Sequence, residues 1–243
     1  AVSIGTAVAG TVASYSAGVS PLAGVTGAAD PTSQGWNASI GGPANNFCWG
    51  GDSTIGGWRI TDGTSTGSCV YQRNLSAGDT FDMTYNDWTA TWTSALVADA
   101  MSKAGGGVDN YYTLDTTRQN NNAMWVEVAG QFAYILIHKA DASGNVVLND
   151  GTSNFQITTA GNQMAQELPA GAPGNVNYIT YTLNSVGGVV SLSDSLGGSY
   201  GPVAKYATYT PTQNRIVWGA FSSGGQGSTA WNEVLVTAVP EPA

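Results

Sequence analysis

Two glutamates are the candidates for acid–base chemistry on a glycosidic bond. Hydrolysis of such a bond uses two carboxyl groups about 5 to 9.5 Å apart, placed on either side of the bond. Glu127 lies beside Trp125 in a strand-like stretch, and Glu233 lies near Trp231. Neither belongs to a compact acidic motif along one strand. We expect both to be solvent-facing strand carboxylates, and we expect the chain to have no catalytic activity.

Nucleophilic catalysis is not indicated either. His138 is the one histidine, and it ends a stretch of apolar residues. No Gly-x-Ser-x-Gly motif marks a serine nucleophile. One histidine and two cysteines are also too few ligands for a typical zinc or copper site. We expect His138 to be a structural or surface residue.

A group of aspartates is the candidate for a metal site. Asp79, Asp82 and Asp87 cluster around an expected turn, and carboxylate oxygens are ligands that Ca²⁺ prefers. No EF-hand spacing is present. A single structural calcium ion is one interpretation, and ordinary turn aspartates are the other. We expect no further cofactor.

Aromatic side chains are the candidates for carbohydrate binding. The chain has 8 tryptophans and 11 tyrosines, whose rings offer large apolar faces with a polar edge. We select Trp49, which lies in a glycine-rich loop, together with Trp58, Tyr111 and Tyr112. The alternative is that these rings pack in the core.

The composition excludes several classes of protein. Charged residues make up 9% of the 243 residues, against about 25% in an average soluble chain. The formal net charge is −9, whereas a nucleic-acid partner calls for a basic surface. Lys, Arg and Glu are scarce, which argues against a helical bundle, and the many aromatic residues argue against disorder. No run of about 18 apolar residues offers a membrane span.

The two cysteines indicate an oxidising compartment. Cys48 and Cys69 flank a segment rich in glycine, serine and threonine, and no histidine is near enough in sequence to suggest zinc. We predict a disulfide, with two unpaired buried thiols as the alternative. Closing this loop would stabilise the fold by roughly 3 kcal/mol. The sequence begins at Ala1 without a methionine or a signal peptide, and we interpret it as a mature exported chain.

Short strand-like segments separated by turn signals run along the whole chain. Residues 88–96 and 132–139 show this pattern, and Phe81, Met83 and Tyr85 alternate with polar residues in the same way. Residues 93–103 are the longest candidate for a helix. Roughly fourteen strands with turns every 8–12 residues predict an all-β antiparallel sandwich. We place this domain at residues 21–238.

A resemblance to a known fold family supports this prediction. Residues 178–194 and 215–234, the latter ending in Trp231-Asn232-Glu233-Val234, resemble the closing strands of concanavalin A-like and laminin-G-like jelly rolls. The resemblance implies a jelly roll. It implies no particular activity, because many functions share this sandwich.

The C-terminus carries a second resemblance. Val239, Pro240, Glu241 and Pro242 are similar to the motif of the PEP-CTERM proteins of Gram-negative bacteria. In that family the motif precedes a hydrophobic helix and a basic tail, and an exosortase recognises the signal. The resemblance implies that residues 239–243 are the remnant of a sorting signal. It also implies a place outside the cell or on its outer surface, in contact with exopolysaccharide.

The N-terminal segment is a candidate for self-assembly. Residues 1–20 carry no charge, and Val2, Ile4, Val8 and Val12 alternate loosely with small residues. Natural sheets protect exposed edge strands with charge or proline. Such a strand is either an ordinary first strand of its own sheet or is donated to the sheet of a neighbouring copy.

Two functions remain open at this stage. One is a non-enzymatic structural protein of the bacterial surface or biofilm matrix, which forms filaments by strand donation between copies. The other is a lectin-like module that binds carbohydrate.

Overall fold

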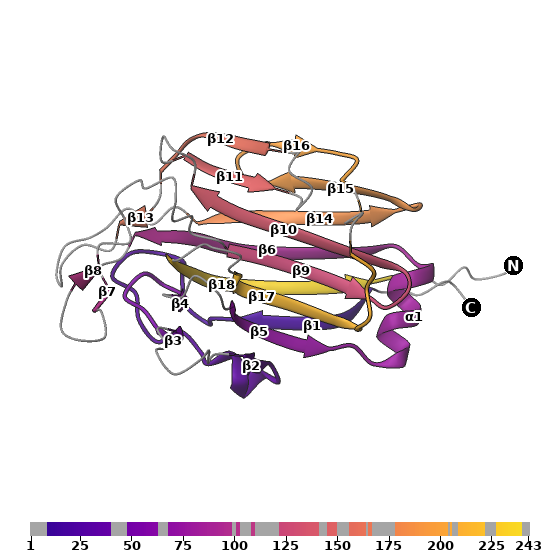
Figure 1. Ribbon diagram of the computed structural model, residues 1–243, viewed down its shortest axis with the longest axis horizontal. Coiled ribbons are helices and arrows are strands. Elements are labelled where there is room, and N and C mark those ends of the chain that lie inside the picture. Colours follow the sequence, from indigo (N-terminus) through magenta and orange to yellow (C-terminus); the bar gives the residue numbers. More distant parts are fainter. Residues whose placement is uncertain are drawn as a thin grey trace, which may run out of the picture.

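Two β-sheets lie face to face and enclose the core (Figure 1). The computed structural model describes residues 9–39, 48–62, 68–98, 101–102, 108–109, 122–140, 145–149, 156–163, 165–166, 178–203, 205, 209–221 and 227–239. Neighbouring strands in both sheets are antiparallel with a single parallel pair among the described residues. The predicted all-β antiparallel sandwich is confirmed.

Sheet A forms the layer at the back of Figure 1. Its strands are β1 (Gly10–Ser16), β3 (Cys48–Asp52), β4 (Trp58–Asp62), β6 (Trp88–Ala98), β13 (Ala165–Gln166), β14 (Ile179–Val186), β15 (Val189–Asp194), β16 (Ser199–Tyr200) and β18 (Gly227–Ala238). The order is β16-β15-β14-β6-β18-β4-β3, with β1 also paired to β18 and β13 parallel to β6.

Sheet B forms the front layer and runs in the order β12-β11-β10-β9-β17-β5-β2. Its strands are β2 (Asn37–Ser39), β5 (Ser68–Asn74), β9 (Asn122–Val128), β10 (Phe132–Ala140), β11 (Asn145–Asn149), β12 (Gln156–Gln163) and β17 (Arg215–Phe221). The remaining elements are the 3₁₀ helix η1 (Pro31–Gln34), the helix α1 (Ala77–Tyr85) and the small pair β7 (Met101–Ser102) and β8 (Val108–Asp109).

Strand residues alternate between the core and the outer faces. On β14, Ile179, Tyr181 and Leu183 are buried, while the residues between them are partly exposed. This period of two is the pattern of a sheet that is covered on one face.

Aromatic rings fill the centre of the core. Trp218 of β17 packs against Tyr15, Trp36, Tyr71 and Trp231, with ring centroids 4.9 to 5.5 Å apart. All five side chains are 2% exposed or less. These ring contacts therefore connect sheet A, sheet B and the N-terminal strand with one another.

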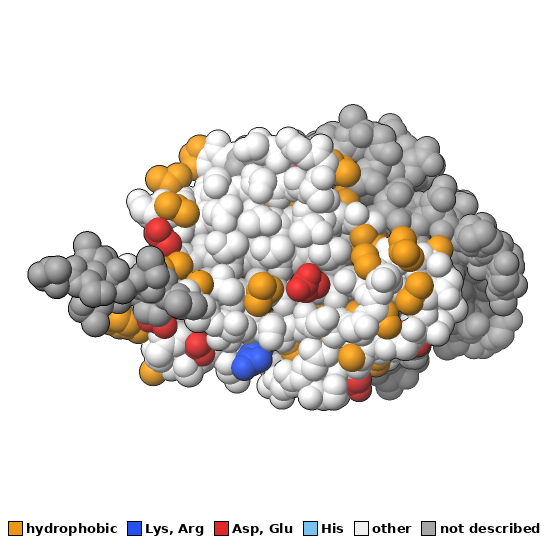
Figure 2. Space-filling model, turned by 180° about the vertical axis from the view of Figure 1, so that it is seen from behind, with side chains coloured by type: hydrophobic (Ala, Val, Ile, Leu, Met, Phe, Trp, Pro, Cys, Tyr) orange, Lys and Arg blue, Asp and Glu red, His pale blue; other side chains and the backbone are white. Residues whose placement is uncertain are grey.

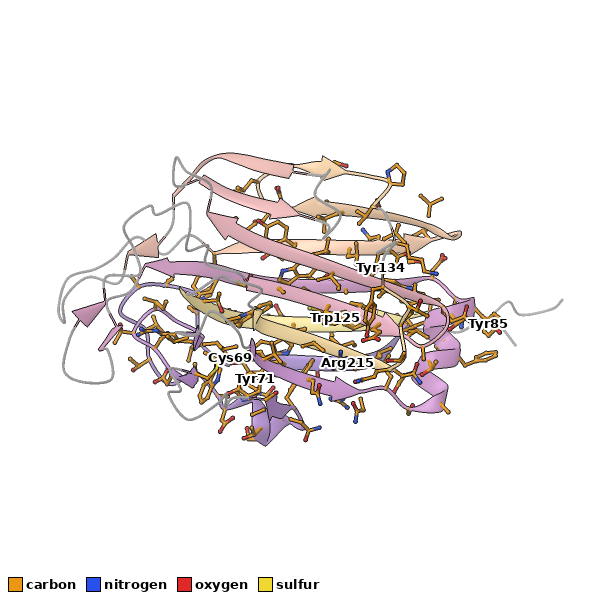
Figure 3. All side chains as sticks on the ribbon, in the orientation of Figure 1. Cys69, Tyr71, Tyr85, Trp125, Tyr134 and Arg215 are labelled. Atoms are coloured by element: carbon orange, nitrogen blue, oxygen red, sulfur yellow. A yellow bond between two sulfur atoms is a disulfide. The ribbon has the colours of Figure 1, made fainter. Side chains whose placement is uncertain are left out.

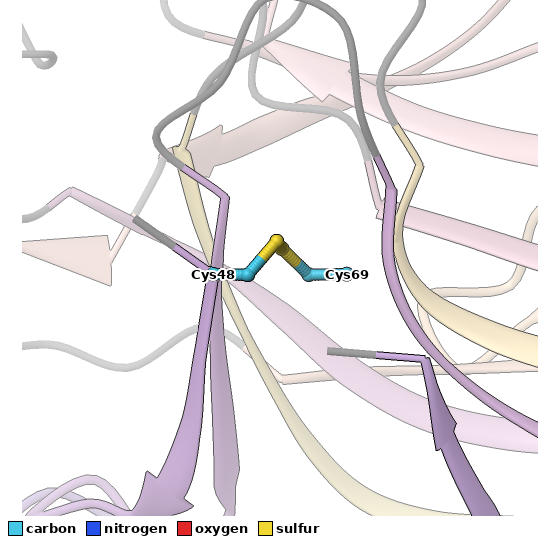
Figure 4. Close-up of a disulfide and its surroundings, with 2 residues drawn as sticks. All are labelled: Cys48 and Cys69. Carbon is cyan, nitrogen blue, oxygen red and sulfur yellow. A yellow bond between two sulfur atoms is a disulfide. The ribbon is translucent and has the colours of Figure 1, made fainter. Parts of the chain in front are cut away.

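The predicted disulfide is confirmed. Cys48 of β3 is bonded to Cys69 of β5, with the two Cα atoms 5.6 Å apart (Figure 4). Because β3 belongs to sheet A and β5 to sheet B, the bond links the two layers covalently.

The strand predicted from Phe81, Met83 and Tyr85 is wrong, because these residues lie in α1. The helix begins at a capping box in which Ser76 accepts from the Asp79 backbone N–H and Asp79 accepts from that of Ser76. This reciprocal pair satisfies two donors that a helix start leaves unpaired. The predicted helix at residues 93–103 is wrong over residues 93–98, which continue β6.

The N-terminal strand lies in the sheet of its own chain. β1 pairs with β18 in antiparallel register, from Gly10 opposite Ala238 to Ser16 opposite Glu233. Residues 10–16 therefore form an ordinary first strand of their own sheet, which is the alternative to strand donation that the sequence left open. Val12 is 5% exposed and packs in the core. Val2, Ile4 and Val8 lie outside the described residues.

The outer edge of β1 is covered by the segment that contains η1. The side chain of Gln34 accepts from the Ser16 backbone N–H at 3.0 Å and donates to the Ser16 carbonyl at 2.8 Å. The indole N–H of Trp36 donates to the Ser14 carbonyl at 2.9 Å. These side chains occupy backbone groups that a further strand would use, which is one way in which natural sheets protect an edge.

The variant Tyr15→Ala tests whether β1 is part of the folded sandwich of its own chain. The ring stacks on Trp218, and its hydroxyl donates to the Ala29 carbonyl at 3.1 Å. We expect the free energy of unfolding, measured with urea, to fall by about 3 to 5 kcal/mol, as for other buried aromatic residues. The matched change Ser14→Ala on the exposed face of β1 should alter it by no more than about 0.5 kcal/mol. Equal stability of both variants would contradict a folded, intramolecular β1.

Candidate functional site

Glu127 is fully buried on the outer face of sheet B, so its predicted exposure to solvent is wrong. Its Oε1 accepts from the Tyr209 hydroxyl at 2.8 Å and from the backbone N–H groups of Thr212 and Gln213 at 3.1 and 3.2 Å. Its Oε2 accepts from Nε of Arg215 at 3.0 Å. Both oxygens are thus occupied by the protein itself, which leaves this carboxylate no access to a substrate.

The partners of Glu127 cover an apolar strip of sheet B (Figure 3). The Arg215 guanidinium lies 4.7 Å from the centre of the Trp125 ring, and Tyr209 meets that ring edge-on. Tyr209 also packs against a small cluster that includes Val70 and Val217. Burial and the bond to Glu127 raise the pKa of Tyr209. The cluster therefore fastens the chain before β17 onto the sheet.

Glu233 is exposed, as predicted, and it lies on the other sheet. Its neighbour Val234 points into the core, so Glu233 projects from the outer face of sheet A. Glu127 belongs to the outer face of sheet B. The core of the sandwich separates the two carboxylates, so they do not flank a common bond.

The change Glu127→Gln tests the structural role of this carboxylate. It removes the ion pair and leaves a mostly buried guanidinium whose other hydrogen bond is a 3.3 Å contact to the Gln72 side chain. We expect the free energy of unfolding to fall by about 2 to 3 kcal/mol. Glu233→Gln, the same change at an exposed site, should alter it by no more than about 0.5 kcal/mol. Thermal unfolding of both variants measures this, and an unchanged stability of Glu127→Gln would refute the anchoring role.

The sequence-predicted carbohydrate residues do not form a site among the described residues. Trp58 is 9% exposed and donates its indole N–H to the Tyr71 hydroxyl at 2.8 Å, so its predicted role at the surface is wrong. Trp49 lies in β3, and its side chain is outside the described part of the structure. Tyr111 and Tyr112 lie outside the described residues.

The three aspartates of the predicted calcium site hydrogen-bond to groups of the protein at and around α1, two of them to backbone N–H groups and Asp82 to a side chain. Asp79 completes the capping box, Asp82 accepts from the Asn86 amide at 3.4 Å, and Asp87 accepts from the Gly187 N–H at 2.8 Å. Within the described ranges, no group of three or more His, Cys, Asp or Glu side chains is placed to hold a metal ion. His138 lies in β10, opposite Asn122 and Leu148, and its side chain is not among those described.

Two exposed aromatic side chains lie on α1, where the alternation of apolar residues predicted a strand. Phe81 is 59% exposed and Tyr85 is 65% exposed, and their ring centroids are 4.9 Å apart. The helix places residues four apart on one face and turns Met83, which is 1% exposed, into the core. The Ser76-x-x-Asp79 spacing is the sequence signal from which the start of this helix could have been predicted.

We call Phe81 and Tyr85 the aromatic pair. One acidic and one amide side chain lie next to it along the chain. Asp82 lies one helical turn before Tyr85 and next to Phe81, and Asn86 follows directly. α1 contains no lysine or arginine. Tyr85 points away from the sandwich at the end where α1 lies (Figure 3). The site thus combines apolar ring faces with the carboxylate of Asp82 at a solvent-exposed end of the molecule.

The outer face of sheet A along β6 and β14 is a second surface, and it is mostly polar. Cross-strand partners on β6 and β14 form the pairs Thr89–Asn184, Thr91–Thr182 and Thr93–Thr180, with polar atoms 2.9, 3.5 and 2.8 Å apart. Figure 2 shows this face from behind, and most of it is neither hydrophobic nor charged. Its hydroxyl groups bind mainly one another, which leaves fewer of them for a ligand.

Comparisons with known proteins support the fold. No protein-family model matches the sequence, and neither does any curated protein. The structure is similar to the carbohydrate esterase vb_24B_21 from the Shiga toxin-encoding bacteriophage phi24B, with 12% identity, a TM-score of 0.53 and coverage of 96% of this chain and 100% of that one.

Two further solved structures are less similar. Trypanosoma rangeli sialidase has 14% identity and a TM-score of 0.48 over 93% of this chain and 30% of that one. Bacillus licheniformis β-glucanase has 11% identity and a TM-score of 0.41 over 98% of this chain and 99% of that one. With TM-scores under 0.5, these two likenesses bear neither on the fold nor on the activity of this chain.

Proposed function

We propose that this chain is a non-catalytic carbohydrate-binding module of an exported protein. The observation that carries the proposal is the aromatic pair, in which two large rings remain exposed on a helix with a buried opposite face. Isolated exposed apolar side chains are ordinary, but a paired aromatic surface next to polar groups is typical of a binding site. The C–H faces of sugar rings pack on such aromatic faces, while their hydroxyl groups use the surrounding acceptors.

The anchoring of α1 supports a preorganised site. The capping box fixes its first turn, Met83 enters the core, and the Asn86 N–H donates to the Asp82 carbonyl at the other end. The helix packs against β9 of sheet B and β18 of sheet A. A site held in place before binding loses less conformational entropy when the ligand arrives.

The absence of catalysis remains part of the proposal. Its support is the position of Glu127 and Glu233 on opposite outer faces, together with the complete hydrogen bonding of Glu127. The rings of the aromatic pair can hold a polysaccharide, but they supply no acid or base for its cleavage.

The site of action that we propose is the outer surface or surrounding matrix of a Gram-negative bacterium. The disulfide supports an oxidising compartment. The resemblance of Val239, Pro240, Glu241 and Pro242 to the PEP-CTERM motif supports sorting to the surface. Among the described residues, no helix is long and apolar enough to cross a membrane. Binding to exopolysaccharide would give the protein a structural role in that matrix without strand donation.

The double variant Phe81→Ala/Tyr85→Ala tests the proposal. Each ring contributes about 0.5 to 1.5 kcal/mol in comparable aromatic contacts, so binding should weaken by roughly 10-fold or more. Affinity electrophoresis in gels that contain neutral, amino-sugar or acidic polysaccharides measures this loss. Leu22→Ala is the matched control, because Leu22 is 60% exposed but lies in the loop that follows β1. Unchanged binding of the double variant would overturn the proposal, as would a lack of binding to every polysaccharide.

A further inference from the structure

We propose that the aromatic pair selects polysaccharides with free amino groups over their neutral or acidic counterparts. The proposal rests on the carbohydrate-binding function above and assigns a chemical class to the ligand. In mildly acidic solution the amine of each amino sugar is protonated, so the chain is then a polycation with an apolar ring face on every sugar. The apolar face of each sugar matches the exposed rings of α1, and the charged amine matches its carboxylates.

The charged side chains on α1 itself are all acidic. Asp79 and Asp82 lie on the helix and Asp87 lies just beyond it, whereas residues 77–87 contain no lysine or arginine. The whole chain carries 16 acidic and 7 basic residues. An acidic surface attracts cationic ligands and repels anionic ones. This disfavours uronic-acid polymers and anionic lipid surfaces as the occupant.

Asp82 is the carboxylate best placed to meet a bound amine. Asp79 is used by the capping box, and Asp87 accepts from the Gly187 N–H. The Oδ1 of Asp82 accepts one long bond of 3.4 Å from Asn86, and among the described residues its Oδ2 has no hydrogen-bond partner. Asp82 is three residues before Tyr85, so the two side chains are neighbours on the helix surface and the carboxylate flanks that ring.

The surface beside these side chains is open. Gly78 lies one turn before Phe81 and Asp82, and a Cβ built there would meet no atom nearer than Ser76 Oγ at 3.7 Å. A sugar ring on the aromatic pair therefore has room to place its amine toward Asp82. The ammonium group gains attraction to the ring faces and a charge-assisted hydrogen bond to the carboxylate. An N-acetylated sugar packs on the same rings but gains neither interaction.

The test compares short oligomers of equal length by isothermal titration calorimetry in mildly acidic buffer, where the glucosamine amines are protonated and the uronic acids and the aspartate are still ionised. The probes are tetramers of β-1,4-linked glucosamine, of N-acetylglucosamine and of a uronic acid. We expect the glucosamine tetramer to bind roughly 5-fold or more tightly than its N-acetylated counterpart, given typical exposed cation–π and ion-pair contributions. The uronic-acid tetramer should not bind.

A pair of charge-removing variants separates the local site from general attraction to an acidic protein. Asp82→Asn should lower the affinity for the glucosamine tetramer by about 3-fold or more and leave the N-acetylated tetramer unaffected, because one exposed ion pair is lost. Glu233→Gln removes an equal charge on the outer face of sheet A and should leave both affinities unchanged.

The outcomes distinguish this inference from the proposed function. Equal binding of the two amino-sugar tetramers would overturn the selectivity while the carbohydrate-binding function stands. Equal losses from Asp82→Asn and Glu233→Gln would also overturn it, because the attraction would then belong to the whole protein. Binding of no tetramer by the wild-type chain would overturn both proposals.

Discussion

The packing of aromatic rings around Trp218 is the constraint on which the rest of the structure depends. β17 carries this ring into the space between the sheets, where it meets rings from β1, β5 and β18. Gly219 lets the strands approach closely enough for this contact. Its φ is +139°, and a Cβ there would lie 2.5 Å from the Cys69 carbonyl oxygen. A side chain at this position would push β17 away from β5 at the centre of the core.

The packed core explains why the functional candidates lie at the periphery. With most of its described aromatic rings buried, the sandwich presents two described surfaces that bear on ligand binding. The outer face of sheet A is a ladder of threonine and asparagine side chains that bind one another. The end of the sandwich beside α1 instead presents the aromatic pair. Phe81 and Tyr85 are the two aromatic residues among the large hydrophobic side chains that are exposed in the described part of the chain. We therefore assign recognition to the end of the sandwich and not to a sheet face.

The sequence predicted the fold class because alternation along a strand is a local property. The stretch from Ile179 to Val186 alternates between buried and partly exposed positions, as its residue types indicate. The same rule failed at α1, where Phe81, Met83 and Tyr85 also alternate, because the capping box overrides a three-residue pattern. Where an alternating pattern and a helix-start signal overlap, the backbone hydrogen bonds of the helix start decide which structure forms. The alternation of apolar residues alone contains no information on these hydrogen bonds.

The candidate site was less predictable because it depends on contacts between distant residues. Glu127 looked like an exposed strand carboxylate, and its burial follows from Tyr209 and Arg215, which lie more than 80 residues later in the chain. Trp58 was likewise a candidate for carbohydrate binding, and its burial and its bond to Tyr71 show the alternative, a place in the core. Burial on the outer face of a sheet depends on which loop covers it, and strand patterns carry no information on that loop.

The most direct test of carbohydrate binding by the aromatic pair is an NMR titration of the ¹⁵N-labelled chain with a glucosamine tetramer. Backbone amides report the location of the ligand residue by residue. Binding at the proposed site predicts chemical-shift changes concentrated in residues 77–87, with little change along β6 and β14. Shifts confined to the outer face of sheet A, or the absence of any shift at millimolar ligand, would contradict the account.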